Sequence, residues 1–149
     1  MNILSMLKEE HAEVGTMLDH LDHTTERAIK TRTEVFNQIV ALLTIHTEFE
    51  EQIFYPRAQE FAKLKDLVLE AYEEHHLVKL LLKELHTLPV EDETWHAKLQ
   101  VLKENVQHHV EEEEDELFPQ LEKLWDDAEL EHLAEEYTAF KGRTYRKAA

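Results

Sequence analysis

Four stretches of the chain repeat apolar side chains every three or four residues, which is the spacing of one face of an α-helix. The chain holds only 2 Gly and 3 Pro in 149 residues, too few to punctuate a sheet of many short strands. The pattern therefore predicts an all-α protein with long helices. The apolar positions of the four stretches are Leu4, Leu7, Val14, Leu18 and Leu21; Phe36, Ile39, Leu43 and Phe54; Val68, Ala71, Val78, Leu82 and Leu85; and Leu99, Leu102, Val106, Leu117 and Leu121.

Local signals place the ends of these helices. Thr31 and Glu34 have the spacing of a capping box, so we expect the second helix to begin near Thr31. The third helix should end before Pro89, and the fourth should begin around Asp92. Pro56 and Pro119 should each kink or restart the helix in which they lie.

A fifth, shorter helix follows the four stretches. Asp126 and Glu129 form a second capping-box pair, and Gly142 is a typical helix-stop residue. Short loops between long helices favour antiparallel neighbours. We therefore expect an up-down-up-down four-helix bundle over residues 1–124, with a C-terminal helix and basic tail over residues 125–149 packed outside it. The basic residues of this part are Lys141, Arg143, Arg146 and Lys147, which could dock on the acidic bundle.

The first and second halves of the bundle repeat each other. His11 and His75 share the same five apolar offsets, and each follows a Glu directly. His46 and His109 share a Glu four residues later and a Pro ten residues later. The separations are 75 − 11 = 64 and 109 − 46 = 63 residues. Two helical hairpins of the same design therefore follow one another in the chain.

Polar side chains interrupt the apolar stripe at the same height of all four helices. Glu is rarely buried without a partner, and unpaired buried ions cost several kcal/mol each. At about 1.5 Å per residue, the interrupting side chains reach one layer of the bundle within about a turn. A metal ion satisfies imidazole and carboxylate together, and this donor set is large enough for two ions. The predicted ligands are His11, His46, Glu50, His75, His109 and Glu113.

Other readings of these residues remain open. His76 and His108 adjoin predicted ligands and would replace them if the helical register were shifted by one residue. The remaining His residues should face solvent: His20, His23, His86, His96 and His132. A ferritin-like site would use an E-x-x-H pair such as Glu73 and His76. A bundle with a hydrogen-bonded polar layer and no metal is the plainest alternative.

Composition excludes several classes of protein. Lys and Arg number 16 against 33 Asp and Glu, a formal net charge of −17, which argues against nucleic acid as a partner. The chain has no Cys, so disulfides, thiolate metal sites and iron–sulfur clusters are excluded. We find no apolar window long enough to span a membrane and no secretory apolar region at the N-terminus. A cytoplasmic protein is expected.

The order His, H-x-x-x-E, His, H-x-x-x-E resembles the hemerythrin-like, or HHE cation-binding, domain family. The matching phrases are EEHAEV, HTEFEEQIFYP, EEHHLVKLLLKEL and HHVEEEEDELFP, over about residues 3–124. The resemblance implies a four-helix bundle with two Fe ions joined by an oxo or hydroxo bridge, for which Zn or Mn could substitute. It also implies a small ligand such as O2, NO or peroxide.

The chain departs from the oxygen-carrying hemerythrins at two positions. Those proteins have a fifth ligand His four residues after the third His, where this chain has Lys79. They also have an Asp five residues after the last His, where this chain has Glu114 and places Glu113 one residue earlier. The four-His, two-Glu set is similar to that of bacterial proteins proposed to repair iron centres under stress.

We therefore expect a non-haem di-iron protein that binds O2 or a related small ligand for sensing, storage or stress response. Two alternatives are an enzyme that decomposes peroxide or NO, and an iron donor for the repair of damaged iron–sulfur centres. We find no set of residues arranged for general-acid catalysis, so the sequence leaves open whether the protein is an enzyme. It also leaves any protein partner undefined.

Overall fold

Five long helices account for most of the computed structural model, which describes residues 1–148 and the side chains of residues 1–144. No strand occurs among the described residues, so the all-α prediction is confirmed. The helices are α1 (Ile3–Asp22), α2 (Ile29–Phe49), α4 (Lys65–Thr87), α5 (Glu93–Glu112) and α7 (Asp127–Ala148). Shorter elements are η1 (Glu50–Phe54), α3 (Tyr55–Ala58), η2 (Ala62–Leu64), η3 (Glu113–Leu117) and α6 (Phe118–Leu124).

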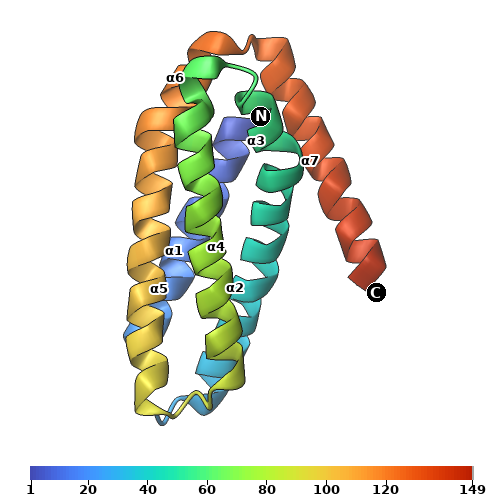
Figure 1. Cartoon of the computed structure of the whole chain (residues 1–149). Coiled ribbons are helices and arrows are strands. Elements are labelled where there is room, and N and C mark those ends of the chain that lie inside the picture. Colours follow the sequence, from blue (N-terminus) through green and yellow to red (C-terminus); the bar gives the residue numbers. More distant parts are fainter. Residues whose placement is uncertain (149) are drawn as a thin grey trace.

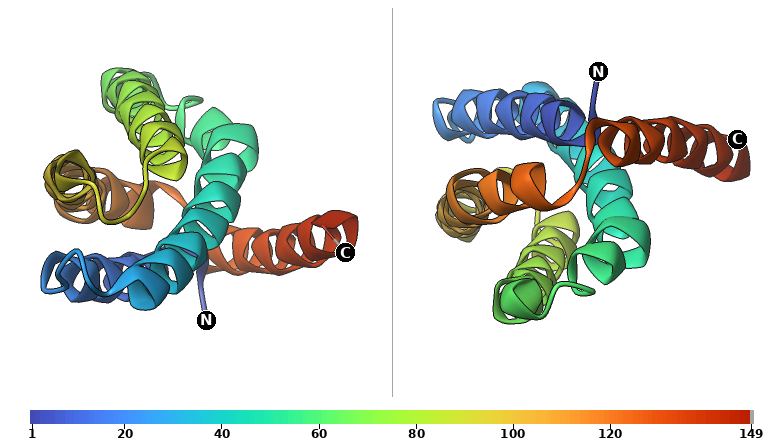
Figure 2. Two further views of the ribbon diagram at one scale, coloured as in Figure 1. Left: turned by 90° about the horizontal axis from the view of Figure 1, so that it is seen from below. Right: turned by 90° about the horizontal axis from the view of Figure 1, so that it is seen from above.

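The first four long helices form the predicted up-down-up-down bundle (Figure 1). α1 packs against α2, and α4 packs against α5, so each hairpin is a closely packed pair. The hairpins meet where α1 packs against α5. The extra helix α7 lies outside the bundle against α1 and α2, as the end-on views show (Figure 2).

Both bundle prolines lie just after a short π-helical turn. Tyr55 donates its backbone N–H to the carbonyl of Glu50, and Phe118 donates to the carbonyl of Glu113, five residues back in each case. Pro56 and Pro119 have no N–H for the usual bond to the fourth residue back, and a proline ring would clash with that carbonyl in a straight α-helix. The wider π turn relieves this conflict, and the α-helical ladder restarts beyond it. The predicted interruption is therefore confirmed in both hairpins.

The predicted end of α4 before Pro89 and the predicted start of α5 at Asp92 are confirmed, because α4 ends at Thr87 and Asp92 caps α5. The capping box predicted at Thr31 is wrong, since α2 begins at Ile29 and its first turn has no side-chain cap. The first turn of α2 is held instead by Arg32, which is buried and donates to the carbonyls of Thr24 and Val90. At the start of α7, Asp126 accepts a hydrogen bond from the backbone N–H of Glu129, at 2.8 Å, as predicted.

Gly142 does not end the last helix. α7 continues to Ala148, and no glycine adopts a positive φ among the described residues, so no left-handed stop forms there. Of the four basic residues expected to dock, Lys141 contacts the bundle at Glu10, and Arg143 lies over the ring of Phe140. The side chains of Arg146 and Lys147 lie outside the described residues.

Two apolar clusters fill the bundle, one toward each end. The first gathers around Phe49, Phe54 and Tyr137 and includes the inner face of α7. The second gathers around Leu18, Trp95 and Leu99, near the α1–α2 and α4–α5 loops. Between the two clusters lies a layer of buried polar side chains. No helix of the described chain is long and apolar enough to cross a membrane.

Candidate metal centre

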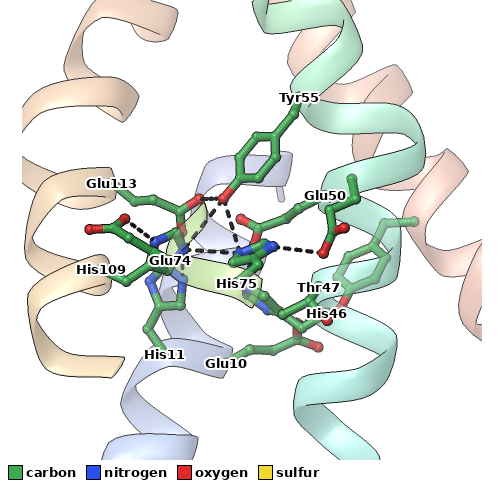
Figure 3. Close-up of polar contacts among 12 residues, drawn as sticks. Glu10, His11, His46, Thr47, Glu50, Tyr55, Glu74, His75, His109 and Glu113 are labelled. Carbon is green, nitrogen blue, oxygen red and sulfur yellow. Dashed lines mark hydrogen bonds and ion pairs between the residues drawn. The ribbon is translucent and has the colours of Figure 1, made fainter. Parts of the chain in front are cut away.

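The structure brings all six predicted ligands together in the layer between the two apolar clusters (Figure 3). All six are buried, with Glu50 fully inaccessible and His11 the most exposed at 8%. Each of the four bundle helices supplies one His, and Glu50 and Glu113 follow at the first residue of each π turn. Of the two adjoining pairs, His75 and His109 are buried, whereas His76 and His108 lie on the surface.

Each carboxylate lies between imidazoles from both hairpins. Glu50 Oε1 lies 3.3 Å from His46 Nε2 and 3.2 Å from His75 Nε2. In the equivalent place, Glu113 Oε1 lies 3.1 Å from His11 Nε2 and 3.4 Å from His109 Nε2. The donor atoms form two overlapping groups, one of His11, His46, Glu50 and Glu113 and one of Glu50, His75 and His109. Two neighbouring cations sharing carboxylates would fit this arrangement.

Four outer carboxylates fix the imidazole rings. The Nδ1 atom of each ligand His lies 2.7 to 3.0 Å from a carboxylate oxygen of a neighbouring helix. An ionised carboxylate can only accept, so each Nδ1 carries the proton and each Nε2 is left free to bind a metal. The pairs are His11 with Glu114, His46 with Glu10, His75 with Glu51 and His109 with Glu74.

The outer carboxylates follow the same internal repeat as the ligands. Glu10 and Glu74 precede the first His of each hairpin, and Glu51 and Glu114 follow the two ligand carboxylates. The repeat of Glu10 and Glu74 is visible in the sequence, but their role is not, because ring orientation depends on how the helices pack. These four carboxylates are the main feature of the site that sequence reasoning missed.

Several of the buried donors have no hydrogen-bond partner. They are His11 Nε2, His46 Nε2, both carboxylate oxygens of Glu50, and Glu113 Oε1. Buried polar atoms are almost always paired, because desolvation without a partner costs about 1–3 kcal/mol each, and more for charged groups. Unpaired nitrogen and oxygen atoms gathered in one buried layer are typical of a metal site, so the residues fit a pair of cations.

The pKa shifts in the donor layer also favour a cation site. Burial by itself would lower the pKa of His46, but the charge of Glu50 and the hydrogen bond to Glu10 raise that pKa to about 10. The pKa of His109 is also raised despite burial, mainly by Glu113, while the pKa of Glu113 is lowered by His109 although burial opposes it. The carboxylates thus attract positive charge to the Nε2 atoms, where either protons or metal ions can supply it.

One more side chain reaches the donors. The hydroxyl of Tyr55 donates to Glu113 Oε2 at 2.6 Å and lies 3.2 Å and 3.3 Å from the Nε2 atoms of His75 and His109. Burial, with the charge of Glu113, holds the pKa of Tyr55 well above its ordinary value of 10.0. The repeat places Phe118 at the equivalent position of the other hairpin, where its ring stacks on His11 at 6.0 Å between centroids. The two halves of the site are therefore chemically different.

A small cavity adjoins the donor layer on the side of the second apolar cluster. Its volume is about 20 Å³, above the roughly 10–15 Å³ that a water-sized molecule needs. Four aliphatic side chains form its wall, each three residues from a ligand His in sequence: Val14, Leu43, Val78 and Val106. The cavity suits a small, weakly polar molecule next to the His rings.

The fold and this donor layer define a class of helical bundle built around a buried cation site. The hemerythrin HHE cation-binding domain profile matches residues 2–121. The chain belongs to this family.

Individual relatives agree with the family and differ in length. A hemerythrin HHE cation-binding domain-containing protein from Mycobacterium kansasii has the same fold, with a TM-score of 0.79 and 24% identity, covering 99% of this chain and 91% of that one. An uncharacterized hemerythrin-like protein of Schizosaccharomyces pombe is 30% identical over 113 residues, 74% of this chain. A DNA nickase of Nostoc is 27% identical over 147 residues, 99% of this chain. The chain spans 41% of the nickase and 56% of the yeast protein.

Proposed function

We propose that this protein is a non-haem di-iron protein that binds O2 or a related small ligand, such as NO or peroxide, for sensing, storage or stress response. The observation that carries the proposal is the set of unpaired, buried Nε2 and carboxylate atoms beside a cavity with an aliphatic wall. The residues that would hold the two ions are His11, His46, Glu50, His75, His109 and Glu113.

Iron is favoured over other cations by the charge around the site. Two ligand carboxylates and four outer carboxylates surround four imidazoles, and among the side chains of residues 1–144 Lys79 and Lys141 are the lysines that contact these carboxylates. So much negative charge stabilises highly charged ions, and imidazole with carboxylate is a donor set that iron accepts. Bound iron would supply reversible electron transfer to a small ligand. Zn or Mn would fit the same donors but would not explain the cavity as directly.

The protein's own side chains have definite tasks in this proposal. The outer carboxylates hold the Nδ1 protons and so fix the direction of each Nε2 lone pair. The aliphatic wall of the cavity excludes water and admits weakly polar ligands. Tyr55 keeps a proton on its hydroxyl at the edge of the donor layer, where it can donate a hydrogen bond to a ligand.

Tyr55 also favours a second candidate function, the turnover of peroxide or NO. Decomposition of either molecule needs protons at the oxygen that leaves, and the Tyr55 hydroxyl holds a proton beside the donors. The DNA nickase relative supports no nicking activity here, because a net charge of −17 repels a phosphate backbone. The cytoplasmic location expected from the sequence stays a prediction.

Metal analysis of protein purified from an iron-supplemented host tests the main proposal. We expect two Fe ions per chain and an absorption band of an oxo-bridged pair that appears on oxidation. His11→Ala should reduce the iron content, and the matched surface variant His132→Ala should not. A metal-free wild-type chain with undiminished thermal stability would refute the proposal. Steady-state consumption of peroxide or NO by the loaded protein would favour turnover, and strictly stoichiometric binding would favour storage or sensing.

A further inference from the structure

A surface groove between α2 and α4 lies next to the central cavity. The groove is lined by Thr44, Glu48, Lys79 and Leu82 together with Leu43, Thr47 and Val78. The last three of these side chains also line the central cavity. They therefore form the whole partition between the groove and the space beside the His rings, and none of them is more than 8% exposed.

The two hairpins face each other along two pairs of helices, α1 with α5 and α4 with α2, and these two pairs are not equally closely packed. The internal repeat pairs α1 with α4 and α2 with α5, so the contact of α1 with α5 corresponds to that of α4 with α2. α1 packs closely against α5, and α4 packs less closely against α2. The looser of the two equivalent faces is the one that carries the groove, and three side chains there line both the groove and the central cavity.

The residues of the partition are suited to transient opening. Thr47 is the only polar member, and its hydroxyl bonds the carbonyl of Thr44 at 3.3 Å, within its own helix. Leu43 and Val78 have apolar side chains without donors or acceptors, so their rotation breaks no hydrogen bond between α2 and α4. At the outer end, Lys79 pairs with Glu51 at 2.6 Å, and the same Glu51 oxygen accepts from His75. The groove thus begins at a charged pair that contacts the site.

We propose that small ligands reach the metal centre between α2 and α4, and that Leu43, Thr47 and Val78 form a gate that admits molecules of only a few heavy atoms. The inference rests on the proposed function, because a gate has a role only if the centre binds a ligand. The route selects by size and not by contact with the bound ligand. Such a gate changes the association and dissociation rates by the same factor and leaves the affinity unchanged.

The internal repeat supplies matched controls for the test. Thr44 lies at the outer end of the groove and corresponds to Gln107 on α5, and both are exposed, so a large side chain at either position should be tolerated. Thr47 corresponds to Val110 in the same way. The variants are therefore Thr44→Trp with Gln107→Trp, and Thr47→Phe with Val110→Phe.

The probe is azide, a linear three-atom ligand, mixed with oxidised iron-loaded protein in a stopped-flow spectrometer. We expect Thr44→Trp to slow both association and dissociation by about tenfold or more, with less than about twofold change in the dissociation constant. Gln107→Trp should leave both rates near those of the wild type. Thr47→Phe and Val110→Phe should both weaken azide binding, because both side chains line the central cavity and a larger one reduces its volume, but only Thr47→Phe should also slow association.

Four results would overturn the gate. Unchanged rates in Thr44→Trp and Thr47→Phe would show that ligands use another path, and slowing by the Gln107 and Val110 variants instead would place that path between α1 and α5. A change in the dissociation constant of Thr44→Trp with an unchanged association rate would show that the groove acts on the bound ligand and not on its passage. Absence of azide binding by iron-loaded wild type would overturn the gate and the proposed function together.

Discussion

Metal binding to this protein should release protons and strengthen steeply as the pH rises. In the metal-free protein the pKa of His46 is raised to about 10, and the pKa values of His75 and His109 are raised too, in each case by nearby carboxylates against the effect of burial. The imidazole of His46 therefore holds a second proton at pH 7, and the raised pKa values of His75 and His109 favour a second proton on those rings. A metal ion binds only the neutral ring, so loading must displace the protons on Nε2.

The size of the effect follows from the number of protons displaced. Each proton released contributes about 1.4 kcal/mol of binding free energy per pH unit, which is a factor of about ten in affinity. If His46 and His109 each lose one proton, the combined affinity for two ions should rise about a hundredfold per pH unit between pH 6 and pH 8. A contribution from His75 would increase this further.

Calorimetric titration with Zn²⁺ or Co²⁺ in buffers of different ionisation enthalpy measures the protons directly. We expect a net release of about two protons or more per chain at pH 7. Binding that releases no protons, with an affinity independent of pH from 6 to 8, would refute the assignment of raised pKa values to carboxylate-paired histidines. His132→Ala, which changes an exposed His, should leave the release unchanged.

The protonation of these His residues also determines how the stability of the metal-free protein depends on pH. A raised His pKa stabilises the folded state fully below the unfolded value of 6.5, and this stabilisation is lost as the pH rises through the folded value, about 10 for His46. The melting temperature of the metal-free protein should therefore fall between pH 6.5 and pH 10, and loading with metal should remove most of that fall. A melting temperature that rises over this range would contradict the assignment.

Three further substitutions test separate parts of the site. Glu113→Ala should lower the metal content to at most one ion per chain, whereas His132→Ala should leave it unchanged. Equal loss of metal from both variants would show that the assignment of ligand residues is wrong. Tyr55→Phe should keep the bound metal but shift its absorption spectrum and ligand affinity, because it removes only the hydroxyl; an unchanged spectrum and affinity would exclude a role for that hydroxyl. Lys141→Met should lower the reduction potential of bound iron, because Lys141 pairs with Glu10 at 2.7 Å and so withdraws negative charge from His46; a potential equal to that of the wild type would refute this coupling.

Apolar periodicity was sufficient to predict the helices and the height of the polar layer. A buried side chain on a helix recurs with a fixed period, so His11, His46, His75 and His109 could be aligned by counting residues along four antiparallel rods. The start of α2 could not be predicted in the same way. Arg32 is buried through bonds to Thr24 and Val90, and such tertiary contacts leave no mark in local sequence.

Tyr55 was missed for a definite reason. In an uninterrupted α-helix the fifth residue after Glu50 points to a different face, so Tyr55 would lie away from the ligands. The π turn brings residues five apart into line and places the Tyr55 hydroxyl beside Glu113. Pro56 was the available signal, since a proline at that position of both hairpins required a change in the helical ladder.

The two π turns limit where the chain can tolerate the deletion of a single residue. A π turn is one residue longer than the α turn that it replaces, and one residue corresponds to about 100° of helix rotation. Deleting a single residue between Glu50 and Tyr55 would place the phenol four residues after Glu50, still on the same face of a regular α-helix, but it would return the ring of Pro56 to the clash with the carbonyl four residues back that the wider turn relieves. Such a deletion should be far less tolerated here than in the α1–α2 loop, so length variation among natural homologues should avoid these five-residue windows.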